Sequence, residues 1–303
     1  MDTSKNRKRK RNRQDVACDI FWRLNRAYKL GRGRDRHKDK KSGQDIKFIY
    51  STRTYETYRE QGKAFAAYAK QKGYKTLDGA KEVVAEYLQL LIDSGKSGFS
   101  VRTAASAIGK VYGVNYSTFG VEMPDRKRSE IKNNRGESKM LAHYNAETVE
   151  KYASILRCIG LRRSEALLAR GADLMQEDGK SYIWVPRGKG GKYRRAIVQG
   201  TDEEIKAVVS LFEEAKKRAE SGGDGRIWPS GIPRNLPVHR YRAEYAKRVY
   251  MSVARPVEGL QKQEKYICRG DLAEVVYDRQ ALAYASEQLG HNRVSVVADN
   301  YLH

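Results

Sequence analysis

Apolar residues recur at intervals of three and four through residues 47–126, which is the period of helices that bury one face in a core. Three or four helices fit this stretch. Ser51 and Thr52 can cap the first of them, and the next two are expected over residues 77–91 and 101–112. The pattern therefore predicts a helical domain in the N-terminal half of the chain.

The pattern over residues 140–303 is also mostly helical. Helices are expected over residues 201–220, 238–254 and 278–289. The second of these would carry His239 and Arg242 on one face, because they are three positions apart. This half of the chain is expected to be a second domain, of mixed α/β type.

A β-hairpin is predicted inside this second helical region. Residues 182–187 and 193–198 are strand-like, and the glycine-rich residues 188–192 between them are typical of a turn. The segment 256–278 contains residues 266–272, which we interpret as a second hairpin. The expected fold class is therefore mainly α with a small β-sheet.

The first 46 residues have a different composition. Basic residues are concentrated in residues 6–13 and 32–41, and such runs usually stay unfolded until they meet a polyanion. A short amphipathic helix is predicted between them, over residues 16–30. We expect residues 1–46 to form a flexible arm that follows DNA phosphates; a solubilising leader is the alternative. The expected DNA contacts of this arm are Lys8, Arg9, Lys10 and Arg11.

Length and charge fit two domains that bind a polyanion. The chain has 303 residues, of which 40% are apolar, whereas one domain typically has about 100–200. Residues 127–139 are charged and poor in apolar residues, which is typical of a linker. A net charge of +23 suits binding to a nucleic-acid backbone. The three cysteines fit neither a disulfide framework nor a zinc site. With no long apolar stretch and no signal-peptide pattern, we expect a cytoplasmic protein without membrane contact.

Four short motifs in the C-terminal half contain residues suited to phosphate chemistry. In chain order they are Gly160-Leu161-Arg162, the turn Gly188-Lys189-Gly190, His239-Arg240-Tyr241-Arg242, and Leu289-Gly290-His291 followed ten positions later by Tyr301. This set resembles that of the tyrosine recombinases, the family of phage integrases and Xer-like enzymes. Tyr241 departs from the family pattern, which usually has leucine there. The helical residues 47–126 resemble the family's N-terminal core-binding domain.

The resemblance implies a role for each of these residues. Tyr301 would be the nucleophile, Arg162 and Arg242 would clamp the phosphate, and His291 would hydrogen-bond it. Arginine suits the clamp because its planar fork stays charged and contacts two oxygens at once. A tyrosine attacks as a phenolate, so nearby cations would ease the loss of its proton, and His239 is the candidate that handles this proton.

The remaining assignments leave alternatives open. Lys189 matches the family's general acid, which protonates the departing 5′-oxygen, but Lys192 could serve instead. Glu165 could support an active-site arginine or be a surface charge paired with Arg162 or Arg163. Lys192 and Arg194 are further expected DNA contacts. His37, His143 and His303 receive no role.

The function implied is that of a site-specific DNA recombinase, an integrase or excisionase of a bacterial mobile genetic element. By resemblance, a homotetramer would hold double-stranded DNA at specific recombination sites, form a 3′-phosphotyrosyl intermediate, and exchange strands through a Holliday junction. A directionality factor is a possible partner. No cofactor or metal is expected, because the protein–DNA link conserves the bond energy. The alternatives are a type IB topoisomerase-like activity and a DNA-binding accessory protein that does not cut.

Overall fold

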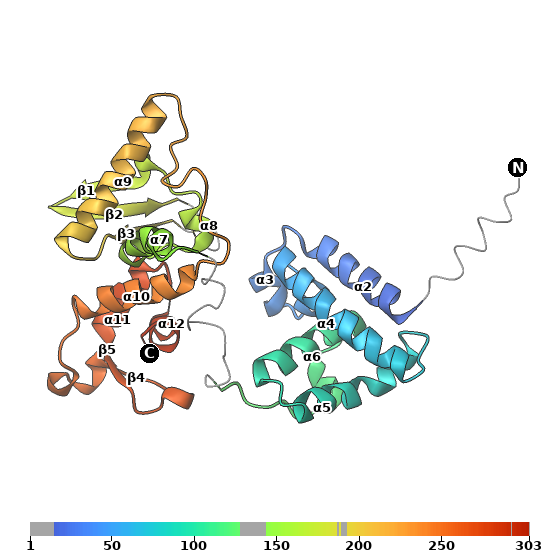
Figure 1. The fold of residues 1–303 in the computed structure, drawn as a ribbon. Coiled ribbons are helices and arrows are strands. Elements are labelled where there is room, and N and C mark those ends of the chain that lie inside the picture. The colour runs from blue at the N-terminus through green and yellow to red at the C-terminus, as the bar shows by residue number, and fades with distance from the viewer. Residues whose placement is uncertain (1–14, 128–143, 187, 189–192, 292, 303) are drawn as a thin grey trace, which may run out of the picture. The chain divides into compact units, whose positions relative to one another are not determined.

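The computed structural model describes residues 15–127, 144–186, 188, 193–291 and 293–302. The chain divides into two compact units, Met1–Ile131 and Lys132–His303 (Figure 1). Both are mainly helical, with small antiparallel sheets in the second, as the sequence predicts. Among the described residues, no helix is both long and apolar enough to cross a membrane.

The first unit is a helical bundle. Its α-helices are α2 (Val16–Gly31), α3 (Arg36–Lys41), α4 (Thr52–Gln71), α5 (Val84–Asp93) and α6 (Gly98–Tyr112), and its 3₁₀ turns are Asp45–Lys47, Gly79–Val83 and Tyr116–Phe119. Ser51 caps α4 by accepting a hydrogen bond from the backbone N–H of Thr54, as its position predicts. The helix expected from residue 77 begins later, because the chain forms the tighter 3₁₀ turn before Val84.

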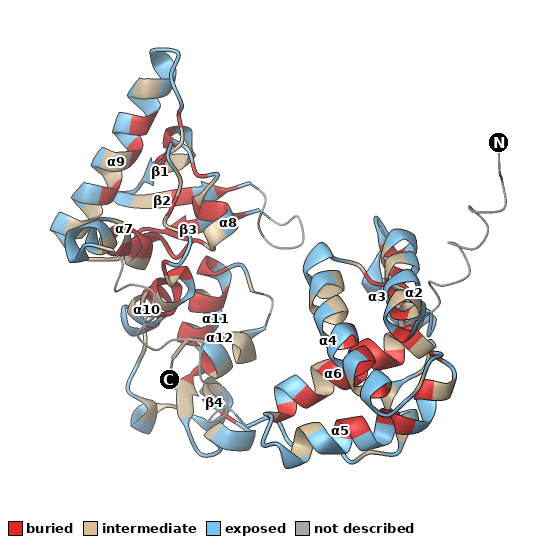
Figure 2. Cartoon of the chain, turned by 45° about the vertical axis from the view of Figure 1, so that its right-hand side comes forward, coloured by how far each residue is buried: buried red, intermediate tan, exposed pale blue. Residues whose placement is uncertain are grey.

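The flexible arm expected over residues 1–46 is wrong for residues 15–46, the part of it that the structure describes. The helix α2 is present as predicted, but Val16, Ile20 and Leu24 are buried in the core of the first unit, where α2 packs on α4 and α6 (Figure 2). Asp39 of α3 accepts two hydrogen bonds from Arg34, so the second basic stretch is also folded. The helix contributes a buried apolar face to this core, which the local charge pattern does not reveal. The basic run at residues 6–13 lies outside the described residues.

The second unit surrounds a three-stranded sheet. Its α-helices are α7 (Ala146–Ile159), α8 (Arg163–Ala166), α9 (Asp202–Glu220), α10 (Val238–Met251), α11 (Arg279–Gln288) and α12 (Val294–Asn300). Its strands are β1 (Leu174–Glu177), β2 (Lys180–Val185), β3 (Arg194–Ile197), β4 (Lys265–Ile267) and β5 (Val276–Asp278). Its 3₁₀ turns are Gly171–Asp173, Val257–Gly259, Lys262–Glu264 and Gly270–Leu272.

The predicted hairpin is confirmed as β2 and β3, which pair antiparallel with Val185 opposite Arg194. The sheet has one more strand than predicted, because β1 pairs with the other edge of β2. The sequence of β1, Leu-Met-Gln-Glu, has no strand-like alternation that could have shown it. A second hairpin also exists, but its return strand is β5, beyond the expected residues 266–272.

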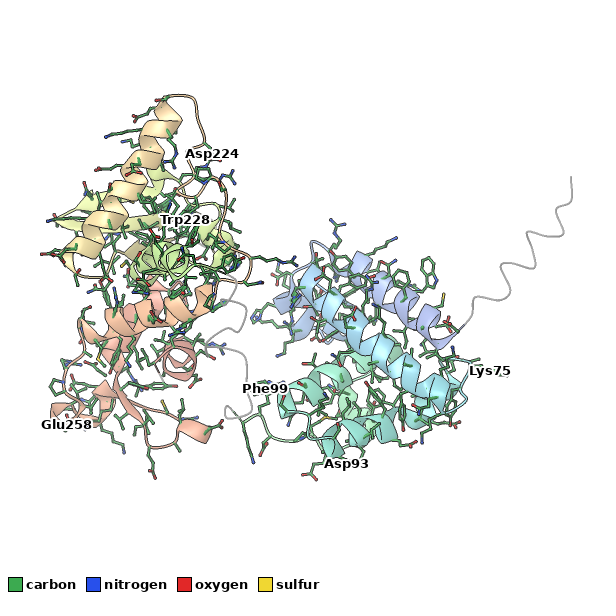
Figure 3. The ribbon with its side chains drawn as sticks, in the orientation of Figure 1. Lys75, Asp93, Phe99, Asp224, Trp228 and Glu258 are labelled. Atoms are coloured by element: carbon green, nitrogen blue, oxygen red, sulfur yellow. The ribbon has the colours of Figure 1, made fainter. Side chains whose placement is uncertain are left out.

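Two buried clusters hold this unit together. One includes Trp228, whose ring lies 5.5 Å from that of Tyr152 of α7 (Figure 3). The other joins α10, α11 and α12 around Tyr245, whose hydroxyl donates to the carbonyl of Ile197 at 2.7 Å. Because one face of α10 and one face of α11 are buried, the polar residues that these two helices carry are held in fixed positions.

Gly160 links the end of α7 to this second cluster, and replacing it with alanine is expected to destabilise the unit by about 2–4 kcal/mol. Its φ of +56° is unfavourable for other residues, and a Cβ there would collide with the ring of Tyr245. Gly222→Ala is the matched control, because Gly222 has φ +80° but open space around it. Denaturant unfolding should show the smaller loss, about 1–2 kcal/mol, for the control. Equal losses would mean that the contact with Tyr245 is unimportant.

Candidate active site

The candidate site begins where α7 ends. Gly160 adopts the left-handed conformation, Leu161 is buried, and Arg162 precedes the short helix α8. Glu165, one turn later, accepts the backbone N–H of Arg162 at 2.8 Å and its guanidinium Nη1 at 2.7 Å. The carboxylate of Glu165 therefore holds both the backbone and the side chain of Arg162 in place.

Glu165 connects arginines from three elements. Arg194 of β3 donates Nη1 and Nη2 to its two carboxylate oxygens at 3.0 and 2.8 Å, and Nη1 of Arg242 lies 4.0 Å away. Burial alone would raise the pKa of Glu165, but hydrogen bonds and charge from Arg194 and Arg162 outweigh it and lower the pKa to about 2. The buried glutamate is thus the anion that compensates this group of cations, and the surface-charge alternative is wrong.

Arg242 is fully buried in the second turn of α10. Its guanidinium donates to the carbonyl oxygens of Gly160 and Leu289, the latter at 2.6 Å, and through Nε to the Tyr301 hydroxyl at 3.4 Å. Burial lowers its pKa to about 10, so it stays charged at neutral pH. These bonds fix the plane of the guanidinium next to Tyr301.

Tyr301 lies at the end of α12, and its hydroxyl contacts Arg242 and His291. Its hydroxyl is 3.4 Å from Nε of Arg242 and 3.3 Å from Nε2 of His291. The His291 and Tyr301 rings lie 5.6 Å apart. The structure thus brings Arg242 to Tyr301, from which it is 59 positions away in the sequence.

The C-terminal end of α11 is the common support of this group. Its last carbonyl groups accept hydrogen bonds from the arginines: Gln288 O from Arg194 at 3.0 Å, and Leu289 O from Arg242 at 2.6 Å and from Arg162 at 3.4 Å. Carbonyls at a helix end lack partners within the helix and carry partial negative charge, so arginines are suitable partners. Gly290 then turns the chain with φ +65° and delivers His291.

His239 occupies the first turn of α10, one turn before Arg242, but the two side chains differ in burial. Arg242 is buried, whereas His239 is exposed to solvent. The two residues share one face of the helix as expected, and Arg242 lies at the centre of the group. Tyr241, at the departure from the family motif, is buried in the core cluster of the sheet.

The expected contact of Arg194 with DNA stays a prediction, and the structure gives this residue a supporting role as well. Its side chain is only 6% exposed and is committed to Glu165 and the end of α11. Strand alternation could have indicated this, because Arg194 shares the inward face of the hairpin with Ala196, opposite Val185 and Ile183. No motif in the sequence marks the supporting role of Arg194, or that of the buried Gln288, whose Oε1 accepts a hydrogen bond from the backbone N–H of Ile197.

Several predicted residues lie outside the described residues. They are Lys8, Arg9, Lys10, Arg11, Lys189, Lys192, His143 and His303. The linker expected over residues 127–139 lies outside them too, except for residue 127. In the described parts of the chain, no three His, Cys, Asp or Glu residues are grouped as a metal site would require.

A cavity of about 640 Å³ opens beside the group. Arg162, Arg194 and His291 line it together with aromatic residues of the hairpin and of α11. It is large enough to receive a ligand. Two arginines of the group and His291, which contacts the Tyr301 hydroxyl, therefore adjoin a space in which a phosphodiester could lie.

Comparisons with known proteins give structural likeness only. No protein-family model and no curated protein match the chain. Similar solved structures include the XerH site-specific recombinase bound to difH substrate, with 15% identity, 95% of this chain and 91% of that chain covered, and a TM-score of 0.49. Another is the Tn1549 transposon integrase in complex with a circular intermediate DNA, with 12% identity, 96% of both chains covered, and a TM-score of 0.47. A third is the XerA recombinase, with 15% identity, 95% and 94% covered, and a TM-score of 0.32.

Proposed function

We propose that the protein is a site-specific DNA recombinase that cuts and rejoins DNA through Tyr301. The observation that carries this proposal is the meeting of the Tyr301 hydroxyl with Nε of Arg242 and Nε2 of His291, beside Arg162. A nucleophilic hydroxyl among fixed cations is what attack on a phosphodiester needs, since negative charge grows on the phosphate oxygens in the transition state.

The proposed reaction conserves the energy of the phosphodiester bond that is broken. The Tyr301 oxygen loses its proton and bonds to phosphorus, while the bond from phosphorus to the 5′-oxygen breaks and that oxygen receives a proton. Attack by the 5′-hydroxyl of a partner strand reverses these steps and frees Tyr301. The link stores the energy of the original phosphodiester, so rejoining needs no nucleotide.

Within this scheme each residue has a stated task. Arg162 and Arg242 hold the phosphate, and His291 hydrogen-bonds it. His239 handles the proton of Tyr301, and Lys189 protonates the departing oxygen, with Lys192 as the alternative. Glu165 keeps the arginines in place.

The wider proposal concerns assembly and biological role. A homotetramer would hold two duplexes and exchange strands through a Holliday junction, as the integrase of a bacterial mobile element acting in the cytoplasm. The net charge of +23 supports DNA as the substrate. Incubation with the end junctions of such an element, followed by denaturing electrophoresis, tests the cutting step. A covalent protein–DNA band is expected, whereas specific binding without any band would favour an accessory protein.

Replacing Arg162 or Arg242 with alanine is expected to reduce cleavage far more than binding. Loss of one preorganised donor to the transition state typically costs on the order of 10²–10³ in rate. Binding involves many phosphates and should weaken only a few-fold. Single-turnover cleavage and gel-shift affinity measure the two effects separately.

Arg240→Ala is the matched control for this pair. Arg240 lies on the same helix, is partly exposed, and pairs with Glu244 at 3.3 Å rather than with the site. Its cleavage rate should stay within a few-fold of wild type. Equal losses of cleavage and binding in Arg162→Ala and Arg242→Ala would contradict the clamp, provided both variants unfold at wild-type denaturant concentrations.

A further inference from the structure

An aromatic pair on the outer face of the hairpin is not used by the proposed chemistry. Trp184 of β2 and Tyr193, which precedes β3, stack with ring centroids 5.3 Å apart and an angle of 29° between the rings. Trp184 is 37% exposed and Tyr193 is 71% exposed. Large rings are usually buried, so a stacked pair left in solvent is an unusual surface feature.

The pair borders the same cavity as the candidate active site. Arg162 and His291 line this cavity together with Trp184 and Tyr193. Tyr182 and Tyr284 add two further aromatic side chains to its wall. An apolar, ring-lined surface therefore continues directly into the region proposed to hold the phosphate.

The cavity lining has three arginines and one acidic residue, and this excess of positive charge favours a polyanion. Arg195 lies over the ring of Tyr182 at 4.3 Å and pairs with Glu177. Arg162 and Arg194 are compensated by Glu165, and Glu287 is the acidic residue in the lining. Aromatic rings next to arginines are the combination that binds single-stranded nucleic acid, in which bases stack on the rings and phosphates meet the cations.

We propose that Trp184 and Tyr193 form a stacking platform for an unpaired nucleobase next to the cleaved phosphate. This proposal rests on the proposed function. A base inside a duplex has both faces covered by its neighbours, so a protein ring can stack only on a base that has left the helix. A strand that is cut and moved to a partner duplex must unpair its bases at the cut. The platform would hold the first of these bases while the strand is exchanged.

The test compares two single strands that differ only in their bases. An oligothymidylate and an abasic oligonucleotide of equal length carry the same phosphates, so only the first can stack. We expect the full-length protein to bind the oligothymidylate roughly ten-fold more tightly. The double variant Trp184→Ala/Tyr193→Ala should reduce this preference to about two-fold or less, while leaving affinity for the abasic strand unchanged.

Trp22→Ala is the matched control, because Trp22 is 60% exposed on α2 in the other unit. Its base preference should equal that of wild type. Trp184→Phe keeps a flat ring and should retain most of the preference, whereas Trp184→Leu keeps an apolar side chain and should lose it. These single variants also decide the question if the double variant fails to fold. A wild-type protein without base preference, or a preference that survives in Trp184→Leu and the double variant, would overturn the platform.

The position of the base is tested with 2-aminopurine, whose fluorescence falls when it stacks. The probe is a nicked duplex with unpaired 2-aminopurine at the nick. Quenching is expected with wild type and Trp22→Ala, and absent with Trp184→Leu. Both measurements report binding and need no cleavage, so they separate the two proposals. A normal covalent complex without base preference would refute the platform alone, while base preference without any covalent complex would refute the proposed function alone.

Discussion

Replacing Tyr301 with phenylalanine is expected to abolish the covalent protein–DNA complex while leaving DNA affinity within a few-fold of wild type. The change removes the one oxygen that lies 3.4 Å from Arg242 and 3.3 Å from His291 and keeps the ring that packs in the core cluster. Loss of the nucleophile should lower cleavage by a factor on the order of 10⁴ or more. Stability should fall by only about 1 kcal/mol, the usual contribution of a hydrogen bond.

Tyr284→Phe is the control for this substitution. Tyr284 lies on α11 and lines the cavity together with Arg162 and His291, so it loses a hydroxyl close to the site and the proposed nucleophile stays in place. Denaturing electrophoresis should show the covalent band for Tyr284→Phe and none for Tyr301→Phe. A band that persists in Tyr301→Phe would mean that another residue attacks.

Replacing Glu165 with glutamine is expected to have the largest effect on stability. Glutamine keeps the shape but removes the charge that compensates Arg162, Arg194 and Arg242. Breaking one side of a buried ion pair typically costs about 3–5 kcal/mol, because the partner charges are left uncompensated. Cleavage should also fall strongly, since the arginines lose their anchor. Denaturant unfolding at neutral pH measures the loss of stability.

The Glu165→Gln substitution should also change how the stability of the fold depends on pH. The folded protein lowers the pKa of Glu165 from its ordinary 4.5 to about 2. A lowered carboxyl pKa stabilises the fold above the ordinary value, and this contribution is lost as the pH falls through the folded value. The stability gap between wild type and Glu165→Gln should therefore be constant down to about pH 4.5 and shrink by roughly 3 kcal/mol by pH 2.

Glu204→Gln is the matched control for Glu165→Gln. Glu204 also binds an arginine through both oxygens, at 2.7 and 2.9 Å from Arg248, but its side chain is 22% exposed against 4% for Glu165. Its loss should cost about 1 kcal/mol or less and leave cleavage unchanged. A gap for Glu165→Gln that does not narrow between pH 4.5 and 2 would show that the charge of Glu165 does not stabilise the site.

Local sequence patterns predicted most helices well because they combine an amphipathic period with a capping residue. The helices expected over residues 201–220 and 278–289 are α9 and α11, and Thr201 and Asp278 cap them in the structure. Patterns of this kind depend on neighbours along the chain. They could not show that α2 packs into a core with α4, or that β1 would pair with β2, because those contacts depend on distant residues.

In the candidate site, too, local motifs were predictive and contacts between distant residues were not. The motifs selected Arg162, Arg242, His291 and Tyr301, and the structure brings these four together around the end of α11. The sequence could not decide whether Glu165 supports an active-site arginine or is a surface charge. Its burial and its hydrogen bonds to Arg194 decide this question. The sequence also gave Arg194 only a role in DNA contact, because the hydrogen bonds of Arg194 to Glu165 and to the end of α11 depend on distant residues.

The most direct measurement of the central claim is the identity of the residue and of the DNA end in the covalent complex. Wild-type protein trapped on a nicked substrate, digested with protease and analysed by mass spectrometry, should give a single DNA-linked peptide, modified at Tyr301. The link should be to a 3′-phosphate, with a free 5′-hydroxyl on the other side of the cut. A linkage at any other residue, or to a 5′-phosphate, would contradict the account.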